Sequence, residues 1–308
     1  MPRANKDAAT AANISLLGGR ILRQAEKYAA QLCELATADG GHLSTVKTGD
    51  LSLHLRRAGK ALTAILPEAD PLPEQRGALM GGMRGMQSAL LPLYVHTLIE
   101  RCREGGLSLS SALLLPIREA NDGRIAYMKN PHTDEAYESF APSVKSPTAH
   151  YMDSYRRSAE EVAAGDADFC ILPYENMGGP LQRFHTLAEQ YSLCCVESCR
   201  VFHADGTDVT HFGLYARHFL PIGEHSAAML SYSFPFSGEE APADHLAALS
   251  AFGARITHMQ CAPEEERLGM RARLTVYLPK NKLTPWLVYL AAFTDGYACH
   301  GLYGVKKQ

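Results

Sequence analysis

The chain has no long apolar run, no excess of basic residues and no CxxC pair of cysteines. Its longest apolar runs, such as residues 283–293, are too short and too interrupted to span a bilayer. A net charge of −3 over 308 residues offers no basic surface to nucleic acid or to an anionic membrane. The stretch from Met1 to Thr10 lacks the apolar core of a signal peptide. These absences predict a cytoplasmic protein that binds neither nucleic acid nor membrane.

The eight cysteines are scattered, and no CxxC pair occurs among them. The densest group is Cys194, Cys195 and Cys199. Leu193 and Val196 flank the first two and indicate a strand, in which neighbouring side chains point to opposite faces. A metal shared by such neighbours is geometrically awkward. We therefore expect buried, reduced thiols.

Residues 11–106 read as a helical domain. Apolar residues at helical spacing predict a first helix that ends near Gly40. A shorter helix is expected from about Leu51 to Leu66, and a third from Pro73 to the Gly105-Gly106 break. Such a hairpin-like domain would complete its core by pairing with a second copy, so we expect a homo-oligomer.

The apolar period changes at Ile125. Strands are expected at 125–128, 169–173, 193–196 and 212–216, alternating with helices at 134–140, 155–164 and 181–190. This alternation predicts a parallel-type α/β lobe over residues 122–220. A linker-like break follows at 221–224.

Residues 226–308 follow the order strand, helix, strand, strand, helix, strand. The expected ranges are 228–236, 243–252, 255–261, 271–278, 285–293 and 299–305. This is the order of a ferredoxin-like βαββαβ module. The fold class expected for the chain is therefore α+β with three domains.

Two short strings at strand ends mark a candidate small-molecule site. Pro173-Tyr174-Glu175-Asn176 follows one apolar strand, and Thr210-His211 precedes another. Ligands of open α/β sheets bind where strands end. A plainer interpretation stays open, in which Glu-Asn is a cap or turn and Thr210 an ordinary edge-strand residue. His211 alternates with Thr210 and would then face the other side of the sheet as a structural histidine.

These strings resemble motifs of the bifunctional chorismate mutase/prephenate dehydratase proteins of phenylalanine biosynthesis. The segment 129–133 resembles the family's Gly-Pro-Glu-Gly-Thr loop and keeps Thr133, and 158–168 resembles its next signature. Pro173 to Met177 resembles Pro-x-Glu-Asn-Ser, and 210–212 resembles Thr-Arg-Phe. The resemblance implies a periplasmic-binding-protein-like dehydratase lobe. It also implies a C-terminal ACT-like domain with phenylalanine as a possible effector.

The resemblance implies decarboxylative dehydration of prephenate, a small carboxylate, to phenylpyruvate. Thr210 would give a proton to the departing hydroxyl, with Asn176 and Glu175 in the same site and Thr133 binding the substrate. No metal or organic cofactor is needed for this chemistry. The alternative is a decayed relative that acts as an aromatic amino-acid sensor or regulatory protein. Met177 in place of the family's serine and the shortened α/β region favour this alternative.

The family's dehydratase domain has two lobes around the active site, whereas this chain has room for roughly one. Half a cleft needs another domain or subunit to exclude water from it. In the helical domain, Arg20 and Lys47 resemble two of the cations with which a chorismate mutase binds its substrate. Ala36 and Leu91 fall where that family has an arginine and a glutamine, so mutase activity is not expected. Surface solvation is the plainer role for Arg20.

Overall fold

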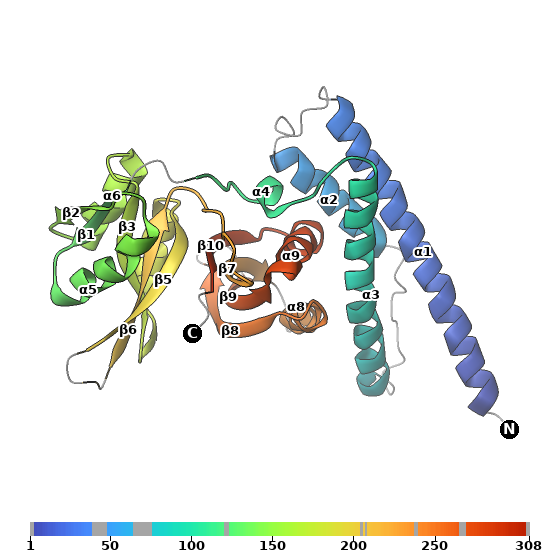
Figure 1. Ribbon diagram of the computed structural model, residues 1–308. Helices are drawn as coiled ribbons and strands as arrows, with labels where there is room; N and C mark the ends of the chain where they lie inside the picture. The colour runs from blue at the N-terminus through green and yellow to red at the C-terminus, as the bar shows by residue number, and fades with distance from the viewer. Residues whose placement is uncertain are drawn as a thin grey trace.

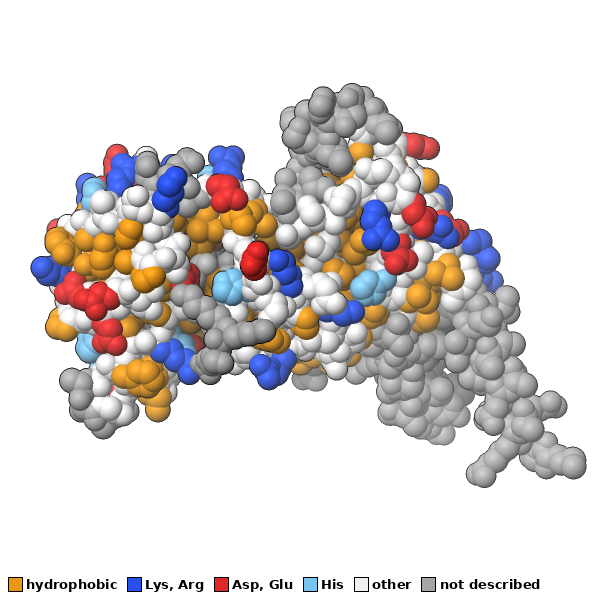
Figure 2. All heavy atoms as spheres, viewed as in Figure 1, with side chains coloured by type: hydrophobic (Ala, Val, Ile, Leu, Met, Phe, Trp, Pro, Cys, Tyr) orange, Lys and Arg blue, Asp and Glu red, His pale blue; other side chains and the backbone are white. Residues whose placement is uncertain are grey.

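A computed structural model shows three blocks in a row, with the C-terminal module between the helical domain and the α/β lobe (Figure 1). The residues that it describes are 3–38, 48–63, 76–119, 123–203, 206, 208–236, 240–264 and 269–305. None of the helices in these ranges has an apolar stretch of the length that a membrane crossing needs. In Figure 2, acidic, basic and histidine side chains are interspersed over the visible face of the lobe and the module.

The helical domain has the three helices expected from the apolar spacing: α1 (Arg3–Ala38), α2 (Thr48–Thr63) and α3 (Arg76–Glu104). A short helix, α4 (Ser111–Leu114), follows. Buried side chains of these helices belong to the same core as Leu230 and Trp286 of the C-terminal module. Within the described residues, the module therefore covers the apolar face for which we expected a second copy.

The contact between α2 and the C-terminal module depends on a glycine. A Cβ atom on Gly59 would overlap the backbone carbonyl of Ala292 in α9 (Lys280–Phe293). Only glycine lets the two helix backbones come this close. Tyr94 of α3 lies next to this contact, with its hydroxyl 3.5 Å from the carbonyl oxygen of Ala58.

The lobe contains every strand and helix that was expected, with longer strands and some additional elements. Its elements are β1 (Arg124–Met128), α5 (Pro131–Phe140), a 3-10 turn (Ala141–Ser143), β2 (Thr148–Met152), α6 (Tyr155–Ala164), β3 (Phe169–Asn176), β4 (Gly179–Pro180), α7 (Gln182–Gln190), β5 (Cys194–Phe202) and β6 (Val209–Ala216). Strands β1, β2 and β3 are parallel, whereas β6 is antiparallel to both β3 and β5. The expectation of a parallel layer therefore holds for one half of the lobe. The short β5–β6 connection requires antiparallel pairing in the other half.

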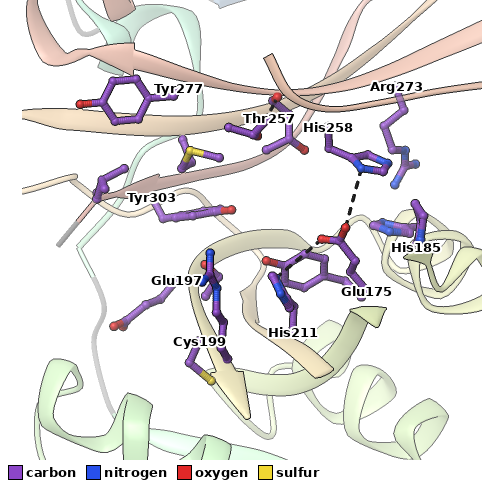
Figure 3. A pocket seen from close by; sticks show the side chains of 18 of the residues that line it. Glu175, His185, Glu197, Cys199, His211, Thr257, His258, Arg273, Tyr277 and Tyr303 are labelled. Atoms are coloured by element: carbon purple, nitrogen blue, oxygen red, sulfur yellow. Dashed lines mark hydrogen bonds and ion pairs between the residues drawn. The ribbon is translucent and has the colours of Figure 1, made fainter. Parts of the chain in front are cut away.

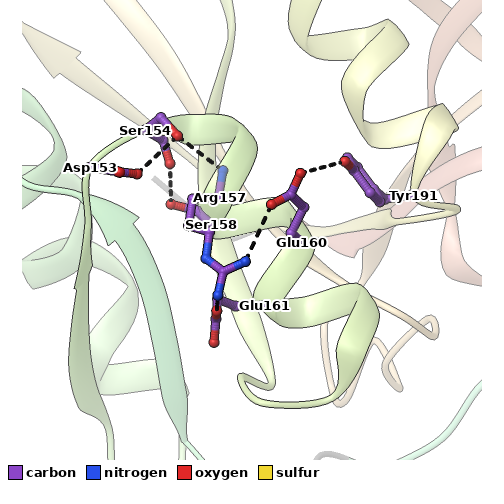
Figure 4. Close-up of polar contacts among 7 residues, drawn as sticks. All are labelled: Asp153, Ser154, Arg157, Ser158, Glu160, Glu161 and Tyr191. Atoms are coloured by element: carbon purple, nitrogen blue, oxygen red, sulfur yellow. Dashed lines mark hydrogen bonds and ion pairs between the residues drawn. The ribbon is translucent and has the colours of Figure 1, made fainter.

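The residues at the two ends of helix α6 determine where this helix of the lobe begins and ends (Figure 4). Ser154 caps its first turn by accepting a hydrogen bond from the Arg157 amide, and Gly165 ends it with a φ of 92°. The Tyr191 hydroxyl, just after α7, donates to Glu160 over 2.8 Å. The stretch 158–168, which resembles a family signature, thus stabilises the lobe at a distance from the strand ends.

The C-terminal module has the expected ferredoxin-like order. Its strands are β7 (Ala227–Phe236), β8 (Arg255–Glu264), β9 (Gly269–Pro279) and β10 (Ala298–Gly304), and its helices are α8 (Glu240–Ala251) and α9. Within the module the strands lie in the order β10-β7-β9-β8, all antiparallel. Strand β10 also pairs with β5 of the lobe, where Gly301 lies opposite Cys195. Lobe and module therefore share one ten-stranded sheet.

We predict opposite effects for two Gly→Ala substitutions in helices. Gly59→Ala should lower the free energy of unfolding by about 1–3 kcal/mol, because the added methyl group overpacks the contact with Ala292. Gly18→Ala in α1 should raise it by about 0.5–1 kcal/mol, because nothing lies within 4 Å of the added Cβ. Urea unfolding followed by circular dichroism measures both. A stable Gly59→Ala variant would contradict the close approach.

We predict that His245 makes the protein sensitive to acid. Its Nε2 lies 2.8 Å from the Tyr232 hydroxyl, and burial among aromatic rings lowers its pKa to about 3. Since the unfolded state binds a proton near pH 6.5 and the folded state does not, stability is full above pH 6.5 and falls below it. Between pH 7 and 5 this loss amounts to about 2 kcal/mol. In His245→Phe the pH dependence of urea unfolding should be weaker by that amount.

Candidate functional site

A cleft of about 750 Å³ lies between the lobe and the C-terminal module. The lobe contributes side chains from β3, β5 and β6, and the module contributes side chains from β7 to β10 (Figure 3). The domain that covers the strand ends of the single lobe is thus the ferredoxin-like module. The need for such a cover was expected from the sequence, but the module was not identified as the domain that provides it.

Two β-bulges turn extra side chains into the cleft. The pairing of β3 with β6 passes from Pro173 directly to Glu175, so Tyr174 is an extra residue there. In β8 the pairing passes from Ile256 to His258, so Thr257 is extra. Regular alternation would send consecutive side chains to opposite faces, but in each strand the bulged residue and the next one both line the cleft.

The centre of the cleft is a carboxylate between two imidazoles (Figure 3). Oε2 of Glu175 lies 3.7 Å from Nδ1 of His211, its neighbour across β3 and β6. Oε1 of Glu175 lies 3.8 Å from Nδ1 of His258 in β8 of the module. The second ring nitrogen of His258, Nε2, is buried and has no hydrogen-bond partner among the described residues. We call Glu175, His211 and His258 the acid–base group.

Burial sets the charge of one member of this group. Desolvation lowers the pKa of His211, and Arg200 acts in the same direction, while the charge of Glu175 opposes both. His211 is therefore mostly neutral at pH 7. A neutral imidazole can accept a proton, so the group offers both an acceptor and a carboxylate.

Three arginines line the cleft. Arg273 of β9 and Arg255 of β8 line the module side, and Arg200 of β5 lines the lobe side. The Arg255 guanidinium lies over the Tyr277 ring, 4.9 Å from its centroid, which restrains its orientation. Guanidinium groups bind carboxylates through two hydrogen bonds, so this lining suits a ligand that carries carboxylates.

Two tyrosines and a serine lie together in the wall of the cleft. The Ser198 side chain acts to lower the pKa of both Tyr174 and Tyr303, but the effect of burial is larger. Burial raises the pKa of both tyrosines, so they stay protonated and can donate hydrogen bonds. They line the cleft together with the acid–base group.

The predicted site residues of the two strings divide between the two faces of the sheet. Glu175 faces the cleft, and so does His211, which the plainer interpretation made structural. Asn176 and Thr210 pair with each other across β3 and β6, and neither lines the cleft. The Thr210 hydroxyl lies 3.0 Å from His203 Nε2, and the His203 ring stacks on His132. Thr210 and His211 do lie on opposite sides of β6, as their alternation predicts.

The remaining predicted residues lie elsewhere. Thr133 is fully buried in the first turn of α5, where its hydroxyl donates to backbone carbonyls and accepts a hydrogen bond from the Asn130 amide. Arg20 is exposed on α1, in the block farthest from the cleft (Figure 1). Lys47 lies outside the described residues.

The module's contribution to the site was not predicted from the sequence. His258 and Arg273 lie in strands that were assigned to a regulatory domain. The signal in the sequence is the alternation of Arg271, Arg273 and Thr275 with buried residues in β9, which marks a polar face that another domain covers.

Of the densest cysteine group, Cys194 and Cys195 are buried as expected, whereas Cys199 is half-buried. All eight cysteines are free, and Cys194 and Cys195 belong to different core clusters on opposite faces of β5. Within the described ranges, no three His, Cys, Asp or Glu side chains are arranged to hold a metal ion.

Comparison with known proteins finds similarity of fold only. No family model matches the chain, and no curated protein matches its sequence. The quorum-quenching acylase GqqA is 18% identical over 59% of this chain and 95% of its own, with a TM-score of 0.49. Prephenate dehydratase from Streptococcus mutans is 16% identical over 60% of this chain and 100% of its own, with a TM-score of 0.49. The Arthrobacter aurescens enzyme in complex with L-Phe is 12% identical over 59% and 90%, with a TM-score of 0.48. Prephenate dehydratases are thus among the structural neighbours of this chain.

We predict that Glu175→Gln lowers the pKa of His211 further. The Glu175 charge favours the protonated ring, so its removal leaves burial and Arg200 unopposed. A histidine NMR titration measures the shift, and His211→Asn assigns the resonance. Glu160→Gln on α6 serves as the control and should leave the resonance unchanged. An unaltered His211 pKa in Glu175→Gln would contradict the contact.

Proposed function

We propose that the protein is a prephenate dehydratase-like lyase whose reaction takes place in the cleft between lobe and module. The observation that carries the proposal is the acid–base group, in which His258 has a buried and unpartnered Nε2. An unpaired buried nitrogen is costly unless a ligand completes its hydrogen bonding. The resemblance of the two strings to dehydratase motifs supports the same reaction.

The reaction needs a proton donor and sites for two carboxylates. The bond between the ring and its carboxylate breaks, and carbon dioxide leaves. The electron pair of that bond moves into the ring as the carbon–oxygen bond to the hydroxyl breaks, and the departing oxygen takes a proton to become water. A positioned general acid accelerates such a step by roughly 10²–10⁴.

In this proposal His258 supplies the proton. Its Nδ1 lies 3.8 Å from Oε1 of Glu175, and its Nε2, which has no hydrogen-bond partner among the described residues, can donate to the departing hydroxyl. The ring then regains a proton from solvent. Arg273 and Arg255 bind the substrate carboxylates from the module side of the cleft.

Thr210 remains a second candidate for the acid, together with Asn176 and Thr133. Asn176 and Thr210 pair across β3 and β6, Thr133 lies in the first turn of α5 after β1, and none of the three lines the cleft. His203, at 3.0 Å, could exchange a proton with the Thr210 hydroxyl. A reaction outside the cleft would use Thr210 and leave His258 idle, so substitutions separate the two sites.

A binding protein is the second candidate function. The observation in its favour is that Thr210 and Thr133, the hydroxyls that the resemblance makes functional, are hydrogen-bonded within the protein and lie outside the cleft. The cleft would then hold a carboxylate without converting it, as in an amino-acid sensor with phenylalanine as effector. Calorimetry with phenylalanine, tyrosine and prephenate tests this candidate.

We predict phenylpyruvate formation from prephenate at neutral pH above a no-enzyme control. His258→Gln should lower kcat by roughly 10²–10⁴, because it removes the proton donor. Thr210→Val should change kcat by less than about threefold. Phenylpyruvate absorbance measures both variants.

The reverse pattern would move the reaction to the Thr210 face. A rate equal to the control in the unaltered protein would contradict a dehydratase. Glu160→Gln serves as the control for nonspecific effects of a substitution in the lobe, and its kcat should equal that of the unaltered protein.

A further inference from the structure

A small cavity of about 40 Å³ lies next to the cleft and shares part of its lining. Tyr174, His185, Arg273 and Tyr303 line both spaces, and Glu189 and His300 line the small cavity alone. A cavity needs roughly 10–15 Å³ of free volume on this measure to hold one water molecule, so the space has room for a group such as a carboxylate. Its wall combines apolar side chains, such as Leu193 and Cys195, with polar ones that include one arginine.

Arg273 is the cation of this cavity. Its side chain is 12% exposed, and burial lowers its pKa to about 10, so it is still charged at neutral pH. Its ion-pair partner is Glu189 of α7, on the lobe side. A buried guanidinium requires an anionic partner, because its desolvation is otherwise uncompensated.

The two histidines beside Arg273 add no charge to the cavity at neutral pH. Burial, reinforced by the charge of Arg273, lowers the pKa of His185 to about 4 and that of His300 to about 3. Both are uncharged at neutral pH. Within the described residues, Glu189 is therefore the one anion that pairs with Arg273.

Glu189 is also less enclosed than its partner. Its side chain is 40% exposed on the surface of α7. Its Oε1 faces both Arg273 and the Nδ1 of His300, the latter at 3.6 Å. His300 is fixed from its other side by a 2.7 Å contact between its Nε2 and the Ser233 hydroxyl. Glu189 can turn to solvent, whereas Arg273 stays in place.

We propose that the small cavity is a carboxylate subsite, in which Glu189 occupies Arg273 until the carboxylate of a ligand displaces it. The ligand enters through the cleft, with its carboxylate on Arg273 and its ring in the larger space. The exchange replaces one anion by another, so the buried arginine never lacks a partner. This inference rests on the proposed function only in taking the ligand to be a cyclic carboxylate.

The test uses benzoate as the probe and uncharged benzamide as its matched analogue, with binding followed by NMR titration. Glu189→Gln should bind benzoate about tenfold more tightly than the unaltered protein, because the internal competitor is gone while Arg273 remains. Benzamide should bind weakly to both. Glu138→Gln, which alters an exposed carboxylate on α5 of the same lobe, should leave benzoate affinity unchanged.

Arg273→Lys and Arg273→Met complete the set, with circular dichroism to verify folding. Each should lose benzoate affinity at least fivefold, also in combination with Glu189→Gln. Equal or weaker benzoate binding in Glu189→Gln would overturn the proposal and would mean that Glu189 only positions Arg273. The benzoate titration does not depend on turnover, so it is independent of the phenylpyruvate assay. Tighter benzoate binding in Glu189→Gln would support the subsite even if the protein formed no phenylpyruvate and the lyase proposal failed. Turnover without tighter binding would support the lyase and overturn the subsite.

Discussion

The pairing of β5 with β10 is the constraint on which the rest of the site depends. It joins the lobe to the C-terminal module at Gly301, where a Cβ atom would lie 3.0 Å from that of Cys195. Because the two strands lie this close, β8 and β9 extend over the ends of β3 and β6. Glu175 can meet His258, and Glu189 can meet Arg273, because this junction joins the strands of the lobe and the module in one sheet.

Much of the fold could be predicted from the sequence because local signals agree with it. The period of apolar residues and the glycine at the C-terminus predicted the bounds of α6, Tyr155 to Ala164, as the structure has them. The order of strands and helices after residue 226 was sufficient to predict the ferredoxin-like topology. Strand β2 was missed because Thr148–Met152 is a half-exposed edge strand without an apolar run. The packing of the C-terminal module against the helical domain is a long-range contact that local patterns do not reveal. The apolar faces of the helices were equally compatible with a second copy of the chain.

The candidate site could be predicted only in part, since it depends on two properties that a single sequence does not encode locally. Glu175 was found because it follows an apolar strand. The bulge at Tyr174 and the docking of the module then decided that the cleft lies on the side of His211 rather than that of Thr210. Bulges leave no regular pattern in composition, and Thr257 gave no sign that His258 would be turned inward.

The division of the acid–base group between two domains has a consequence for how this protein can evolve. The proposed site takes a carboxylate from the lobe and an imidazole from the module, so exchange or loss of either domain would remove part of it. Mutations that shift one domain are compensated only by mutations in the other. The two domains are therefore expected to be inherited as a pair, with substitutions at facing positions of the cleft that depend on one another.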